Sequence, residues 1–192
     1  MSENKTLINK GYKFRFYPNK EQEIYLSKVF GCGRFIYNYF LAENKKAMEL
    51  HKESPNTITK PSFKFEELCS KLPFLKKEED KLWLAEVPAL TLQQSVRQFS
   101  TALTNAVKSK KGFPKFKNKN GRQSVTFTTF GYKLDGNKLT LAKCEKPLEI
   151  KLHRSLPKNS TLGNISISKD PSGKYYVSFN CKYEISEDDK TD

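Results

Sequence analysis

The sequence lacks the features that mark several specialised classes of protein. It contains no long uncharged hydrophobic run and no recognisable signal peptide, so we expect a cytoplasmic protein that has no membrane anchor. Its four cysteines include no Cys-x-x-Cys pair, and only two histidines accompany them, which excludes the usual spacing of zinc ligands. We therefore predict reduced thiols, no bound metal and no other cofactor.

Basic residues, by contrast, are abundant and unevenly distributed. The chain has a formal net charge of +14, and residues 108–182 contain 17 basic but only four acidic side chains. Residues 1–107 are closer to balance, with 17 basic and 12 acidic side chains, and residues 183–192 are acidic. A basic surface on a folded domain is typical of proteins that bind nucleic acid.

The densest charge lies in the fifteen-residue segment 108–122, KSKKGFPKFKNKNGR, which has no acidic residue. Because like charges at this density repel one another, a polyanion nearby would relieve the repulsion. An anionic membrane fits poorly as this polyanion, because membrane binding favours an amphipathic helix and this segment is broken by glycine and proline. The alternative interpretation is a solvated loop that binds no ligand. The predicted contacts with a nucleic-acid backbone are Lys108, Lys110, Lys111, Lys115, Lys117, Lys119 and Arg122.

The first half of the chain predicts helices. Asn19 and Gln22 form a capping-box pattern, which predicts the start of a helix. We expect this helix to break at residues 31–33, Gly-Cys-Gly, and a second helix to continue to about residue 52. The pair 20–52 resembles a helix-turn-helix, and an ordinary helical hairpin is the alternative.

Short helices are expected at 63–71 and 76–84, followed by a long helix over 88–108 that starts at Pro88. The long helix has one apolar stripe, and three polar side chains lie off it. Glutamine and arginine make bidentate contacts to adenine and guanine edges, although a solvated helix face is the alternative interpretation. These side chains are Gln93, Gln94 and Arg97.

Strand patterns occupy the rest of the chain. Residues 11–17, GYKFRFY, alternate between aromatic and basic side chains, which predicts a half-buried strand with Lys13 and Arg15 on its outer face. Five further segments with a period of two follow residue 122. We therefore predict an α+β fold: a small antiparallel β-barrel with a helical domain inserted after the first strand. Barrels of this size commonly hold nucleic acid across an open face.

The expected division has three parts. The barrel would comprise residues 1–18 and 112–183, the helical domain residues 19–111, and an acidic tail residues 184–192. The basic segment would then join the helical domain to the barrel, and we expect Phe113 to pack against the barrel.

Five motifs in order resemble the N-terminal part of TnpB (OrfB-type) proteins, which are transposon-encoded RNA-guided nucleases related to type V CRISPR effectors. They are YKFRFYP-x-KEQ, FGCGRFIYNYFL, LWLAEVPALTLQQSV, KGFPKFK and DPSGKYYVSF. The resemblance covers about residues 11–183. It implies a wedge-type barrel split by a helical recognition domain, which agrees with the fold predicted from the patterns.

The resemblance also implies partners and roles. In that family the two domains bind a guide RNA from the transposon end and read a short motif in duplex DNA beside the target. Gln93 aligns with a motif-reading position, and so do Phe63, Thr128 and Thr129. Basic barrel residues would contact the nucleic-acid backbone by charge and shape. Those in the barrel strands and loops are Lys13, Arg15, Lys151 and Arg154.

The resemblance stops before the RuvC-type nuclease that follows in the family. Hydrolysis by that route needs clustered carboxylates that hold divalent metals, and the late acids here lie in a polar stretch, EISEDDKTD. We therefore predict no catalytic residue and no nuclease activity in this chain by itself. The chain would then act with a separately encoded RuvC half or be a truncated remnant. The alternative functions are a DNA-binding repressor and a structural RNA-binding protein.

Overall fold

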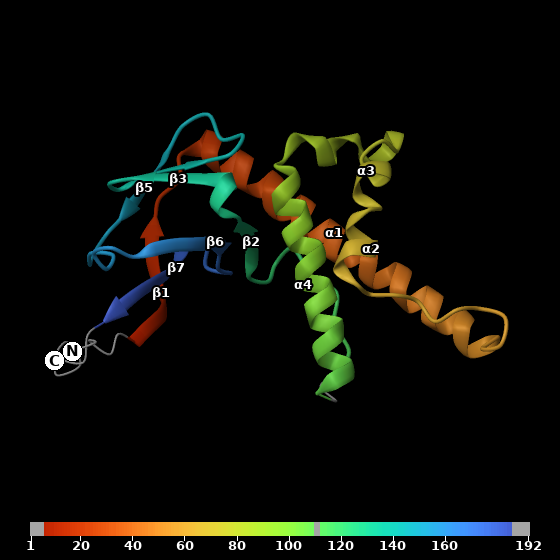
Figure 1. Ribbon diagram of the computed structural model, residues 1–192. Coiled ribbons are helices and arrows are strands. Elements are labelled where there is room, and N and C mark those ends of the chain that lie inside the picture. The colour runs from red at the N-terminus through yellow and green to blue at the C-terminus, as the bar shows by residue number, and fades with distance from the viewer. Residues whose placement is uncertain (1–5, 110–111, 186–192) are drawn as a thin grey trace.

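The computed structural model describes residues 6–109 and 112–185 of the 192-residue chain. Figure 1 shows a β-sheet part on one side and a helical part on the other, joined by the long first helix. Among the described residues no helix is long and apolar enough to cross a membrane. Nor do these residues contain a group of three or more His, Cys, Asp or Glu side chains that could hold a metal ion.

The sheet contains seven strands within the described ranges, in the order β2-β6-β7-β1-β5-β4-β3. Strand β1 (Thr6–Phe16) pairs antiparallel with β7 (Tyr175–Ile185) over its whole length, and with β5 (Leu148–Lys151) at its C-terminal end. The other strands are β2 (Gln123–Phe127), β3 (Tyr132–Asp135), β4 (Lys138–Leu141) and β6 (Thr161–Lys169).

The sheet curves into a nearly closed antiparallel barrel. Near the opening, the hydroxyl of Tyr132 at the start of β3 donates a hydrogen bond of 2.7 Å to the carbonyl of Gly163 on β6. Alternate residues of the strands point inward, as the period of two predicted; Phe14, Phe127 and Phe179 are each 1% exposed. The predicted α+β fold, with helices inserted after the first strand, is therefore confirmed.

The helical part differs from the prediction at its start. Helix α1 (Lys20–Glu53) is one continuous helix of 34 residues, so the expected break at 31–33 is wrong. A Cβ on Gly33 would lie 3.0 Å from both Ser95 Oγ and Val125 Cγ1. Gly33 is therefore explained by close packing against the neighbouring helix and strand, and not by a turn. The predicted capping box at Asn19 and Gln22 is confirmed, with both hydrogen bonds at 2.9 Å.

Helix α4 (Ala89–Lys108) follows the expected long helix closely, and its apolar stripe packs against α1. The rings of Tyr37 and Phe40 on α1 lie 5.9 Å and 6.4 Å from that of Phe99 on α4. The connection between the two helices contains shorter elements, as expected. These are α2 (Phe65–Cys69), α3 (Leu72–Leu75) and the 3-10 helix η1 (Glu79–Glu86).

The buried apolar residues of the helical part and the barrel form one continuous cluster. The domain boundary at residue 19 and at 111 stays a prediction. At the C-terminal end, β7 extends to Ile185, so Glu184 lies in a strand and not in a tail; most of the predicted acidic tail lies outside the described residues. The four cysteines are free, and burial raises the pKa of the Cys32 thiol to about 11.

Candidate nucleic-acid interface

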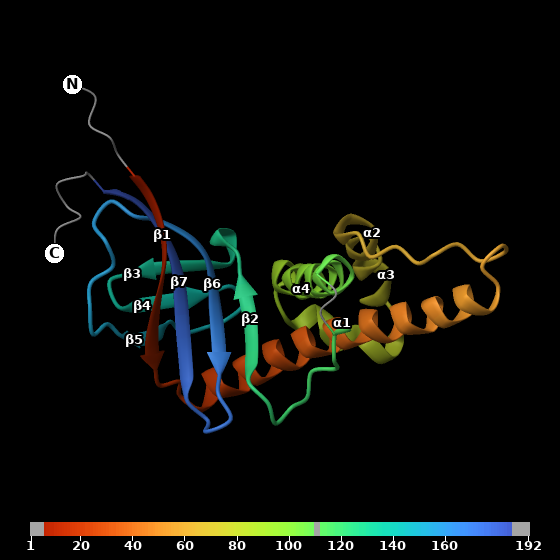
Figure 2. The ribbon, with the colours of Figure 1, turned by 90° about the horizontal axis from the view of Figure 1, so that it is seen from below.

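The outward face of β1, β7, β6 and β2 is uncovered: Figure 2 shows these strands side by side with none of the described helices over them. Lys13 and Arg15 point outward on β1, because Phe14 and its neighbours point into the barrel. Arg15 lies directly opposite Lys151 on β5 in the strand register. Two like charges in cross-strand positions destabilise the pair unless an anion lies nearby. The structure thus brings three predicted backbone-binding residues together.

These cations rest on aromatic rings. Lys13 Nζ lies 4.0 Å from the ring centre of Tyr176, and the Arg15 guanidinium lies 4.6 Å from that of Tyr17. The guanidinium of Arg154, another predicted residue, lies 4.8 Å from the ring of Tyr12, which points into the barrel, so Arg154 lies apart from the outward face. Arg15 Nε is buried and has no hydrogen-bond partner among the described residues. A cation on a ring keeps its charge, so this face can attract phosphates.

Small hydroxyl side chains continue the same face and were missed by the sequence analysis. In the strand register Lys13 lies opposite Ser178 on β7, which in turn lies opposite Ser166 on β6. Ser166 lies opposite Thr126 on β2. The row ends at α4, where Gln98 Nε2 donates a hydrogen bond of 3.4 Å to Thr126 Oγ1. The sequence signal for this row was the presence of serine and threonine at the outward positions of the predicted strands.

The basic segment divides into buried and exposed cations. Lys117 lies between α1 and α4, where its Nζ donates a hydrogen bond of 2.8 Å to Gln98 Oε1 and lies 4.2 Å from the ring centre of Tyr37. Its backbone makes two hydrogen bonds with the Asn38 side chain, and burial lowers the pKa of its ammonium group. Lys117 therefore anchors the segment to the helices, and its exposed neighbours are better placed for backbone contacts.

Those neighbours are oriented toward solvent. The exposed predicted residues of the segment are Lys108, Lys115, Lys119 and Arg122; Lys110 and Lys111 lie outside the described residues. Phe113 and Phe116 are about half exposed and flank Lys45 of α1, whose Nζ lies 5.8 Å and 4.8 Å from their ring centres. Phe113 thus lies beside α1, and the prediction that it packs against the barrel is wrong.

On α4 the three off-stripe residues lie on two faces. Gln93 and Arg97 are four residues apart and share one face, where the Arg97 guanidinium lies 3.8 Å from the ring centre of Phe65. Gln94 shares the other face with Gln98, which contacts β2. The amide groups of Gln93 and Gln94 have no hydrogen-bond partner in the described part of the chain, so both can accept a ligand.

The other predicted motif-reading residues surround α4. Phe63 is half-buried, and its carbonyl accepts a 2.7 Å hydrogen bond from the Ser100 hydroxyl. Thr128 follows β2, and its buried Oγ1 has no partner among the described residues; Thr129 is exposed. Next to them Phe130, which the sequence analysis missed, is 90% exposed on the short 3-10 turn η2 (Thr129–Gly131). In the sequence, the only signal for an exposed ring at Phe130 was that this residue falls outside the alternating strand pattern.

Comparison with known proteins agrees with the resemblance in the sequence. A family model described as a helix-turn-helix domain, of the OrfB type from IS605 elements, matches residues 6–53. These residues fold as β1 and α1. Over 93% of its length the chain is 31% identical to a protein of Streptomyces pristinaespiralis named "Putative RNA-guided DNA endonuclease". The chain therefore carries an OrfB-type domain at its N-terminus and is homologous to the N-terminal part of a TnpB-type protein.

Two further proteins are similar to the chain. "Putative RNA-guided DNA endonuclease InsQ" of Escherichia coli (strain K12) is 27% identical over 91% of this chain. The chain spans 42% and 41% of the length of the Streptomyces and Escherichia proteins. Virulence protein VsdF of Salmonella dublin is 33% identical over 114 residues, which are 57% of this chain and 93% of VsdF.

Proposed function

We propose that this chain is a cytoplasmic, TnpB-like nucleic-acid-binding module that holds a guide RNA and reads a motif in duplex DNA next to the target. The observation that carries the proposal is the uncovered barrel face. On it Lys13, Arg15 and Lys151 are neighbours, Lys13 and Arg15 contact aromatic rings, and the hydroxyl side chains of β7, β6 and β2 continue the surface. Such a surface suits the phosphates and hydroxyls of a nucleic-acid backbone.

The division of labour follows from where the side chains lie. The barrel cations and the exposed lysines of the basic segment would contact backbone, which fixes register without reading sequence. Gln93, Gln94 and Thr129 would contact base edges, since α4 packs beside β2 and carries unpaired amides. Phe130 offers an exposed ring beside Thr129 for contact with a base.

We propose that the chain binds without cutting. Cleavage would require the remaining part of the relatives, which the chain does not match, and a separately encoded RuvC half could supply it.

Binding to a labelled transposon-end RNA, followed by capture of a duplex library, tests the proposal. We expect a preference for that RNA over an unrelated RNA of equal length, and enrichment of one short motif beside the guide-matched sequence. Gln93→Ala should change the enriched motif, since a good bidentate contact discriminates bases by about 1–3 kcal/mol. Thr101→Ala, at an exposed position of the same helix, is the matched control. Equal binding to both RNAs would refute the proposal.

A further inference from the structure

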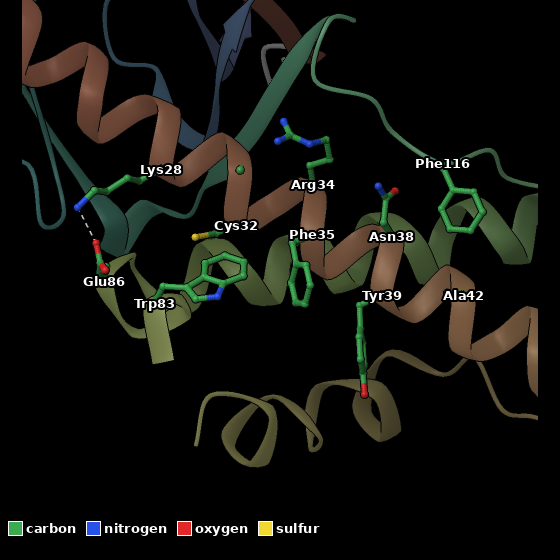
Figure 3. Close-up of a pocket in the computed structure, with 11 residues that line it drawn as sticks. Lys28, Cys32, Arg34, Phe35, Asn38, Tyr39, Ala42, Trp83, Glu86 and Phe116 are labelled. Carbon is green, nitrogen blue, oxygen red and sulfur yellow. Dashed lines mark hydrogen bonds and ion pairs between the residues drawn. The ribbon is translucent and has the colours of Figure 1, made fainter. Parts of the chain in front are cut away.

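A groove of about 730 Å³ runs along α1, and none of the residues predicted to read DNA lines it. Figure 3 shows its walls: Phe35 and Tyr39 project from α1, Trp83 from η1, and Phe116 from the basic segment. The ring centres of Phe35 and Trp83 are 5.0 Å apart in an edge-to-face arrangement. Trp83 is 37% exposed and Phe116 is 51% exposed, so ring surface is available to a ligand.

Charge is distributed unequally along this groove. Arg34 lines it and also lines a second hollow, of about 340 Å³, together with Lys119 and Lys169. Arg34 Nη1 donates a 2.6 Å hydrogen bond to Gln123 Oε1, which holds the guanidinium in place. Its other N–H groups have no hydrogen-bond partner among the described residues.

The acids nearby do not cancel this positive end. Glu86 lies at the groove but is ion-paired with Lys28 at 2.6 Å. In the second hollow Asp170, which accepts hydrogen bonds from the Ser172 hydroxyl and the Lys174 backbone N–H at 2.8 Å and 2.9 Å, keeps its negative charge but is outnumbered by Arg34, Lys119 and Lys169. The other end is different: burial and the carboxylates of Glu43 and Glu78 raise the pKa of Tyr39, and they outweigh Lys81, which lowers it. A phosphate is therefore favoured only at the Arg34 end.

We propose that this groove binds unpaired nucleotides of a single strand, with bases against the rings of Trp83 and Phe116 and phosphate on Arg34 and Lys119. Aromatic walls beside a cationic hollow are the combination that single-strand binding sites use, because every base has a face that stacks and every linkage carries a charge. The volume is within the range of sites for small ligands. The inference rests on the proposed function, since it adds a single-strand site to a nucleic-acid-binding module.

Trp83 makes the site directly observable, because it is the chain's one tryptophan. The full chain is titrated with fluorescein-labelled single strands of about twelve nucleotides, as RNA and as DNA, and with a duplex of the same sequence. Anisotropy reports binding at any site, and tryptophan emission reports the groove. We expect both single strands to quench Trp83 and the duplex to bind without quenching; the tighter of RNA and DNA identifies the occupant.

Two phenylalanines provide a matched pair of variants. Phe116→Ala removes a groove ring and should weaken single-strand binding about fivefold or more, as expected for loss of one stacked base. Phe113→Ala removes a similarly exposed ring of the same segment that does not line the groove, and should change affinity less than twofold. Binding without quenching, or equal effects of both variants, would overturn the inference while leaving the proposed function intact. Absence of binding to any RNA or duplex would instead reject the proposed function.

Discussion

In the helical part of the described structure Lys28, Lys64 and Lys81 pair with carboxylates, whereas the barrel residues Lys13, Arg15 and Arg154 lie on aromatic rings. Lys28 pairs with Glu86, and Lys81 with Glu78 at 2.5 Å. The ion pairs of Lys28, Lys64, Lys81 and Lys146 each include at least one residue from 19–111, and that of Lys146 joins the barrel to Glu21 of α1. Lys13 and Arg154, on the barrel, contact the rings of Tyr176 and Tyr12.

The two arrangements have different consequences for a polyanionic ligand. A carboxylate cancels the charge of its lysine, so such a residue adds little to the field around the protein. A ring holds the cation in position through its quadrupole and leaves the positive charge in place. Lys13, Arg15 and Arg154 are therefore oriented by rings and have no carboxylate partner among the described residues. The net charge of the chain is a poor guide to which cations are available, and their immediate partners are a better one.

The largest expected effect comes from removing the packing that holds the helical part together. Phe99 is fully buried on α4, against the rings of Tyr37 and Phe40. Phe99→Ala should lower the free energy of unfolding by about 3–5 kcal/mol, because the ring's transfer energy is lost and a cavity is left. Urea denaturation monitored by circular dichroism measures the change.

The same experiment examines whether the two parts unfold together. Because the buried residues of the barrel and the helical part form one cluster, we expect a single unfolding transition in the wild type and in Phe99→Ala. The midpoint should lie at a lower urea concentration in the variant. Thr101→Ala, at an exposed position of the same helix, should leave the free energy of unfolding within about 0.5 kcal/mol of the wild type. Two transitions in the Phe99→Ala variant, one of them at the wild-type midpoint, would instead show that the barrel and the helical part unfold independently.

The second prediction concerns the barrel cations directly. Replacing Lys13, Arg15 and Lys151 together with glutamine should lower affinity for duplex DNA about tenfold or more. It should also reduce the slope of log affinity against log salt by about 0.9 for each phosphate that the variant no longer binds. Anisotropy titrations at several salt concentrations measure both quantities.

The matched control removes three charges that are already paired. Glutamine at Lys28, Lys64 and Lys81 changes the net charge by the same amount, but these lysines have carboxylate partners. We expect a smaller loss of affinity and an almost unchanged salt slope. Equal effects of the two triple variants would mean that net charge matters more than the partners of each cation, and the comparison between the two parts would then fail.

The sequence predicted the fold well where the pattern was local. Alternation along β1 and the apolar stripe of α4 depend on neighbouring residues, and both are confirmed. The predicted break at residues 31–33 was wrong. It was expected because two glycines so close together usually weaken a helix, but Gly33 is needed for close packing against Ser95 and Val125. That packing joins residues far apart in the sequence, so no local pattern could indicate it.

The candidate site shows the same limit. Composition predicted a basic nucleic-acid-binding surface, but it could not separate Lys117 from Lys115. The difference depends on Gln98 and Tyr37, which lie on other elements. The row of hydroxyls from Ser178 to Thr126 was missed for a related reason, since single serines in separate strands become a surface only through the strand register.

The smallest expected effect distinguishes Lys117 from Lys115. Lys117→Met removes a partly buried charge, and at pH 7 we expect the variant to be more stable by roughly 1 kcal/mol while its nucleic-acid affinity is unchanged. Lys115→Met should leave stability unchanged and weaken binding to all sequences about equally. Urea denaturation measures the stability of both variants, and anisotropy titration measures their affinity for nucleic acid.

The pH dependence provides an independent measurement on Lys117. Burial lowers its pKa from the ordinary value of 10.5, so between the lowered pKa and 10.5 the folded lysine is neutral while the unfolded one is still protonated. Raising the pH through this interval favours the folded wild type. The stability advantage of Lys117→Met should therefore shrink as the pH approaches 10.5. An advantage that stays constant over this range would show that the ammonium group is fully solvated in the folded protein, and Lys117 would then belong with the free cations of the segment.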